Sequence, residues 1–205
     1  LEFILNSNVA PKAYTTWTPI GTDAQCFEGT LHGDGYMISD LSNSLFGTLC
    51  GNVYNLGVTG SFTTAGIVDT GDGYVENCCI DTSGLPTGSV RAVFGNPTRG
   101  HDTQIVNCYY PDNKNYSKDD NRRGLARPMN EKDFHNGTVA YNLNGFYLNK
   151  RYYDKTQGTT GTCYNYLTDE TGNMIPGYYP ASYAMYPLPE DPEHPTEGIS
   201  RSEER

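Results

Sequence analysis

The sequence predicts an all-β fold: a right-handed parallel β-helix (a solenoid of stacked turns) with a short helical cap and an irregular, tyrosine-rich C-terminal annex. Two observations predict it. Glycine (23 residues) and tyrosine (17 residues) are abundant, which favours turns and strands over helices. In addition, one short pattern recurs along the first half of the chain, and such recurrence is typical of repeat architectures.

The recurring pattern is a β-branched residue, a variable position, Asn or Asp, and then Leu or Cys. Its copies start at Ile38, Val53, Val75 and Ile105. Each copy is too short to form a stable strand alone, so it can bury its apolar side only if equivalent strands stack above and below it. The Asn side chains of three copies would then form a ladder of amides from turn to turn.

A second element, small and apolar with a glycine, precedes three of these copies at residues 45–47, 65–68 and 92–95. A glycine-containing turn follows each one, and glycine adopts the positive φ that a sharp corner requires. An antiparallel sandwich with glycine-rich turns is the alternative fold. The β-helix is favoured because a sandwich does not require similar residues at equivalent points.

Four stretches carry a resemblance to a known family: "WTPIGT" (17–22), "FEGTLHGDGYMISDL" (27–41), "LFGTLCGNVYNLGVTGS" (45–61) and "GYVENCCID" (73–81). They resemble the GLUG-motif β-helical repeats of bacterial cell-surface proteins, which are common in anaerobic gut bacteria. The resemblance covers about residues 15–110. It implies a β-helix and an extracellular or cell-surface location. His32 departs from the family pattern, which usually has Asp there, and the segment that names the motif is reduced to "AGIVDTG".

Five segments are expected along the chain. They are an N-terminal lead-in (1–14), the β-helix repeats (15–110), a connector with a capping helix (111–145), the tyrosine-rich annex (146–188) and a charged tail or linker (189–205). The helix is predicted between Asn130, a suitable N-cap, and Leu143, with Phe134 and Val139 on its apolar face. We expect it to cover the last turn, whose strand edges would otherwise be exposed.

Composition excludes some partners. The formal net charge of -10 disfavours nucleic acid, because the phosphate backbone would repel the chain. No apolar stretch approaches the about 20 residues needed to cross a bilayer, so no membrane insertion by this segment is expected. Residues 1–10 lack the basic start and apolar core of a signal peptide. We therefore expect a mature protein or a piece of something longer.

The six cysteines include an adjacent pair, Cys78 and Cys79, but no Cys-x-x-Cys spacing. No metal site and no cofactor are predicted, since a zinc site needs paired ligands at turn spacing. The cysteines are either buried thiols or disulfides. Buried thiols are slightly favoured, because four of the six lie in or beside the repeats.

Catalytic motifs are absent: the sequence has no Gly-x-Ser-x-Gly, His-Glu-x-x-His or phosphate-binding loop. Because glycoside hydrolysis needs two carboxyl groups about 5–9.5 Å apart, Asp69 and Asp72 are the secondary candidates for a polysaccharide-degrading enzyme, a lyase or a glycoside hydrolase. Their glycine-rich turn favours aspartate for turn hydrogen bonds alone. No catalytic residue is therefore predicted in the leading interpretation.

Aromatic residues are the predicted ligand contacts, because an exposed ring offers a flat apolar face with a polar edge. The candidates are Trp17, Tyr109, Tyr110, Tyr178 and Tyr179. In the alternative interpretation, which ordinary sheet propensity favours, such tyrosines pack the annex against the solenoid. The predicted function is a non-catalytic, extracellular or cell-surface module for adhesion. It would bind surface glycans or proteins and belong to a larger surface protein or assembly.

Overall fold

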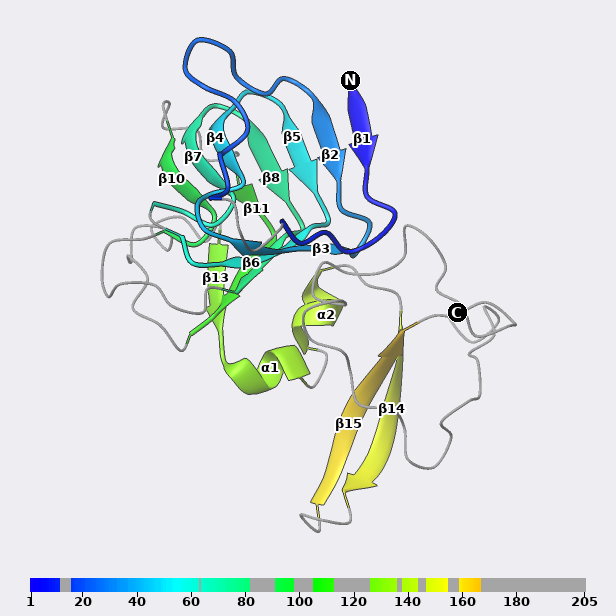
Figure 1. Cartoon of the computed structure of the whole chain (residues 1–205). Coiled ribbons are helices and arrows are strands. Elements are labelled where there is room, and N and C mark those ends of the chain that lie inside the picture. Colours follow the sequence, from blue (N-terminus) through cyan, green and yellow to red (C-terminus); the bar gives the residue numbers. More distant parts are fainter. Residues whose placement is uncertain are drawn as a thin grey trace.

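The computed structural model describes residues 1–11, 16–62, 64–81, 91–97, 105–112, 126–135, 138–143, 147–154 and 159–166. Within these residues, three parallel sheets enclose one core, and a separate antiparallel pair lies toward the C-terminus (Figure 1). The strands of each sheet come from successive turns of the chain. The fold is a β-solenoid, so the predicted fold class is confirmed.

Each sheet collects one side of the solenoid. Sheet A holds β1 (Glu2–Ile4), β2 (Thr30–His32), β5 (Asn52–Tyr54), β8 (Tyr74–Glu76) and β11 (Ile105–Val106). Sheet B holds β3 (Met37–Leu41), β6 (Gly57–Gly60), β9 (Cys79–Asp81), β12 (Cys108–Pro111) and β13 (Ala126–Met129). Sheet C holds β4 (Phe46–Leu49), β7 (Val68–Gly71) and β10 (Phe94–Pro97). Three turns therefore contribute a strand to every sheet, and partial turns flank them.

The core consists of inward side chains that stack in register from one turn to the next. The stacked sets are Leu31, Val53, Val75 and Ile105 in sheet A; Ile38, Val58 and Ile80 in sheet B; and Phe46, Val68 and Phe94 in sheet C. All of them belong to one buried cluster. Fully burying one such side chain is worth about 1.5–3 kcal/mol, so stacking supplies the stability that a single short strand lacks.

Asparagine forms the corner between sheets A and B. Asn55, Asn77 and Asn107 have φ angles of 53°, 54° and 51°, in the left-handed region that Asn adopts more readily than most residues. The Asn107 side-chain amide donates to Asn77 Oδ1 at 2.6 Å and to the carbonyl of Asn142 at 2.7 Å. The predicted amide ladder is thus present between these two turns.

The sequence pattern aligns Ile38 with Val53, and the strand pairing shows that this alignment is wrong. Ile38 lies in sheet B and pairs with Val58, whereas the sheet A equivalent of Val53 is Leu31. The physical reason is a longer corner. Between β2 and β3 the chain makes a turn with Asp34 (φ 49°) and Gly35 (φ 81°), where later turns use one asparagine, and these extra residues shift the pattern.

The solenoid begins earlier than predicted, because the lead-in forms part of its first turn. β1 pairs with β2, and bridges join Val9 to Ile38 and Ile20 to Phe46. The large hydrophobic residues that are exposed in the described part of the chain all lie in this turn: Leu1, Phe3, Ile4, Val9 and Ile20. Among the described residues, this turn packs against β2 and its neighbours on one side.

The predicted capping helix is present as two short helices, α1 (Glu131–His135) and α2 (Thr138–Asn142). Phe134 and Val139 are buried against Cys79 and Tyr109. Because neighbouring strand residues point to opposite faces, and Ile80 lies in the core, Cys79 faces outward. The helices therefore cover the outer face of sheet B rather than the end of the stack, which corrects the predicted position of the cap.

The annex was predicted to be irregular, but part of it is regular. β14 (Tyr147–Asp154) and β15 (Thr159–Tyr166) pair antiparallel along their full length. Tyrosine is common in both segments and threonine in β15, and both residues favour strands. The remaining annex (167–188), the connector between residues 113 and 125, and the tail lie outside the described residues.

Candidate binding face on sheet A

The outer face of sheet A carries two columns of side chains, one residue per turn. The first column is Glu2, Thr30, Asn52 and Tyr74, and the second is Ile4, His32, Tyr54, Glu76 and Val106. From β2 onward they point outward because the neighbouring apolar residues, Leu31, Val53, Val75 and Ile105, point into the core. Successive members are about 4.8 Å apart, the spacing of paired strands.

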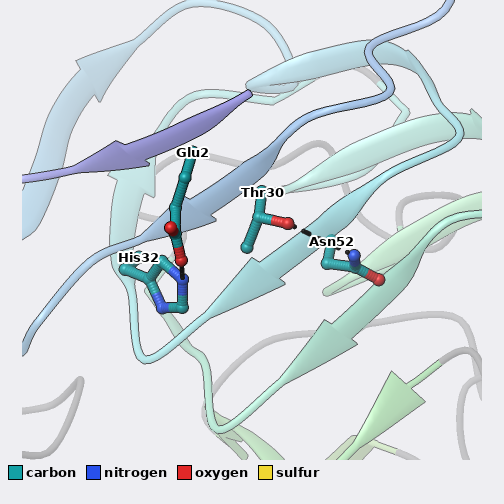
Figure 2. A network of polar contacts seen from close by, with 4 residues as sticks. All are labelled: Glu2, Thr30, His32 and Asn52. Atoms are coloured by element: carbon teal, nitrogen blue, oxygen red, sulfur yellow. Dashed lines mark hydrogen bonds and ion pairs between the residues drawn. The ribbon is translucent and has the colours of Figure 1, made fainter.

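We call seven of these residues the sheet A strip: Glu2, Thr30, His32, Asn52, Tyr54, Tyr74 and Glu76. Figure 2 shows its first four side chains reaching toward one another across neighbouring strands. Glu2 Oε1 lies 2.9 Å from His32 Nε2, and Asn52 Nδ2 donates to Thr30 Oγ1 at 3.4 Å. The side chains of Glu2 and His32 are 68% and 31% exposed, so this end of the strip is open to a ligand.

Aromatic rings form the middle of the strip. The His32 and Tyr54 rings stack with centroids 5.4 Å apart and planes 21° apart, and Tyr54 and Tyr74 lie 5.9 Å apart and tilted by 55°. Because these rings pack against each other along the solenoid axis, their polar edges can face the solvent. The Tyr54 hydroxyl has no hydrogen-bond partner among the described residues, so it is free to bind a ligand.

The far end of the strip is an oriented donor–acceptor pair. The Tyr74 hydroxyl donates to Glu76 Oε2 at 3.1 Å. Burial raises the pKa of the Tyr74 phenol, and the hydrogen bond to Glu76 raises it further. The phenol therefore stays protonated at neutral pH and holds the Glu76 carboxylate in place.

Two of the predicted aromatic contacts are buried. Tyr109 is 3% exposed and lies beneath the helices, and Tyr110 is 2% exposed and lies in the core. A ligand that approaches from solvent does not reach them, so they are not retained as binding residues. They are buried because β12 is covered on both faces.

Trp17 has a structural role. Its ring is half-buried against the core, and its indole N–H donates to the carbonyl of Ser44 at 3.0 Å. Tyr178 and Tyr179 lie outside the described residues. The sheet A strip itself was missed, although a signal for it exists: a polar or aromatic residue stands on each side of the apolar anchors Leu31, Val53 and Val75.

The two candidate catalytic aspartates, Asp69 and Asp72, lie within and directly after β7, respectively. Asp69 Oδ1 accepts a hydrogen bond from the Ser44 hydroxyl at 2.5 Å. Asp72 is exposed in the turn after β7, beside Gly71, whose φ of 125° requires glycine. The contact with Ser44 thus gives Asp69 a structural role, and Asp72 lies at the solvent-facing turn.

Both predicted states of cysteine occur. Cys26 and Cys50 form a disulfide between the first and second turns, whereas Cys78, Cys79 and Cys108 are buried free thiols. Burial raises the pKa of the Cys108 thiol well above its usual range, and contact with Cys78 raises it further. Burial does the same for the pKa of Cys79. These thiols stay protonated and are poor nucleophiles.

No three His, Cys, Asp or Glu side chains gather as a metal site in the described part of the chain. No described helix is both long enough and apolar enough to span a bilayer. Comparisons with protein-family models, curated proteins and solved structures returned no match.

Proposed function

We propose that this chain is a non-catalytic β-solenoid module of an extracellular or cell-surface protein, and that it binds glycans or proteins through the sheet A strip. The observation that carries the proposal is the strip itself. It presents stacked rings, a free hydroxyl, an amide and two carboxylates on one face of a sheet whose backbone is held by neighbouring turns. Residues that hydrogen-bond and stack in a fixed arrangement are typical of recognition surfaces.

Two observations support the proposed location. The disulfide between Cys26 and Cys50 is typical of oxidising compartments outside the cytosol. The resemblance to GLUG-motif repeats agrees with a bacterial cell surface. We propose that the chain belongs to that family and acts in adhesion, as part of a larger surface protein or assembly.

A binding experiment tests the proposal. The wild-type chain and a Tyr54→Ala/Asn52→Ala variant are applied to an array of glycans and to immobilised surface proteins. We expect binding by the wild type and a loss of at least tenfold in the variant. Thr59→Ala serves as the control, because Thr59 follows the core residue Val58 and so lies on the outer face of sheet B. Binding that survives the double variant, or no binding at all, would contradict the proposal.

The same polysaccharides test the alternative, a lyase or glycoside hydrolase. Incubation with the chain is scored for new reducing ends and for unsaturated products. We expect neither. Turnover that is lost in Asp69→Asn or Asp72→Asn would establish an enzyme and end the non-catalytic interpretation.

A further inference from the structure

We infer that the ligand of the sheet A strip is an uncharged polysaccharide that lies along the solenoid axis, across the strands. This inference rests on the proposed function and names the class of ligand. Three features of the strip carry it: its periodicity, its charge and the free hydroxyl at its centre.

The strip is periodic in one direction. Its two columns run at right angles to the strands, and each turn adds one outward side chain to each column. The step of about 4.8 Å between paired strands is comparable to the length of one pyranose unit in an extended glycan. An extended polymer therefore meets a new pair of hydrogen-bonding or aromatic side chains at each of the strands β2, β5 and β8, whereas a compact ligand does not.

The strip has no aliphatic side chain among its seven residues. Protein interfaces obtain most of their binding energy from a few large side chains in a desolvated centre. The exposed large hydrophobic residues of the described chain are confined to the first turn, and of these only Ile4 and its neighbours in β1 border the strip. The central residues Asn52, Tyr54 and Tyr74 instead offer hydrogen-bonding edges, as a glycan requires.

Charge excludes acidic glycans. Glu2 and Glu76 lie at opposite ends of the strip, and His32, its one side chain able to carry positive charge, already contacts Glu2. Among the described residues up to 112 there are ten Asp and Glu and a single basic side chain, Arg91. Uronic-acid and sulfated chains are repelled by such a field. Sugar hydroxyls, in contrast, donate charge-assisted hydrogen bonds to carboxylates.

Cationic chains are a poorer match than uncharged ones. Each carboxylate of the strip already has a partner, since Glu2 contacts His32 and Glu76 accepts from Tyr74. The carboxylate oxygens that these contacts leave open can accept hydrogen bonds from one or two sugar hydroxyl groups. The acidic ends thus act as oriented acceptors of hydrogen bonds.

Tyr54 is the central contact. It lies in register between His32 and Glu76, it shares β5 with Asn52, and its hydroxyl is free among the described residues. Tyr54→Phe removes this hydroxyl and keeps the ring that stacks on His32. The variant therefore tests hydrogen bonding to the ligand without disturbing the fold.

The experiment is affinity electrophoresis of the full chain, followed by titration calorimetry. The probes are soluble uncharged polysaccharides (a β-glucan, a galactomannan, an arabinoxylan and an α-glucan) and two polyanions, polygalacturonate and heparin. We expect retardation by at least one uncharged polysaccharide and none by the polyanions. Tyr54→Phe should weaken binding about 3–10-fold, the worth of one hydrogen bond, and Thr59→Ala should leave it unchanged. Thermal melting confirms that both variants fold.

Three outcomes overturn the inference. One is preferential binding of a polyanion. Another is binding of an uncharged polysaccharide that neither Tyr54→Phe nor Asn52→Ala weakens, because the ligand would then lie elsewhere. The third is capture of a protein through the strip with no polysaccharide bound, which refutes this inference and leaves the proposed function standing. A chain that binds neither glycan nor protein refutes both.

Discussion

Replacing Val75 with alanine tests whether stacked turns share one core. Val75 is fully buried in β8, in register with Val53 on one side and Ile105 on the other. The change removes two carbon atoms, worth about 0.8 kcal/mol each by transfer. The cavity left between two turns adds to this, because neighbours relax only partly. We therefore expect the free energy of unfolding to fall by about 2–3 kcal/mol.

Urea unfolding followed by circular dichroism measures this loss, and thermal melting should show a fall in Tm of about 4–12 °C for a chain of this length. Val106→Ala is the matched control, since Val106 lies on the outer face of sheet A and should lose less than about 1 kcal/mol. The Val53→Ala/Val75→Ala pair should be non-additive by about 0.5 kcal/mol or more, as expected for residues in contact. Equal losses at Val75 and Val106, or strict additivity of the pair, would refute the stacked core.

Three further predictions concern the cysteines and the asparagine corner. Cys26→Ser/Cys50→Ser opens a loop of sequence separation 24 and should lower the free energy of unfolding by about 3–3.5 kcal/mol; denaturation with and without reductant checks this, and equal midpoints would be inconsistent with the disulfide. Cys79 and Cys108, whose thiols have a raised pKa, should react slowly with a thiol reagent in the native protein even at pH 9, and fully after unfolding; rapid native labelling would contradict their burial. Asn107→Ala should cost about 1–3 kcal/mol by loss of its hydrogen bonds and by strain at positive φ, and Asn107→Gly should recover only the strain, because it also lacks the amide; an Asn107→Gly variant as stable as the wild type would refute the role of the amide.

The repeat pattern predicts the solenoid well where the corner between sheets is short. Val53, Val75 and Ile105 are each followed at the same distance by an asparagine, and all three stack in register. The first turn has a longer corner at Asp34 and Gly35. The residue of the first turn that is equivalent to Val53 is therefore Leu31 and not Ile38, which only the strand pairing reveals.

The sequence does not reveal which aromatic residues are buried, and this limited the prediction of the binding site. Period-two alternation in "NCYYP" places Cys108 and Tyr110 on one face of β12 and Tyr109 on the other, but only the packing of the helices shows that Tyr109 is covered as well. The sheet A strip depends on alignment in the same way. Once Leu31 is paired with Val53, the following residues His32 and Tyr54 come together on the outer face.

The Cys26–Cys50 disulfide changes how the molecule would respond to a pulling force. Hydrogen bonds between turns run along the solenoid axis, so tension on the N-terminal residues peels off strands one at a time. At Cys26 the covalent link passes the load directly to Cys50, so the residues between them carry no tension. Under a pulling force the chain would therefore release its outermost segment first, and β2, β3 and β4 would be shielded from the force for as long as the sulfur–sulfur bond is intact.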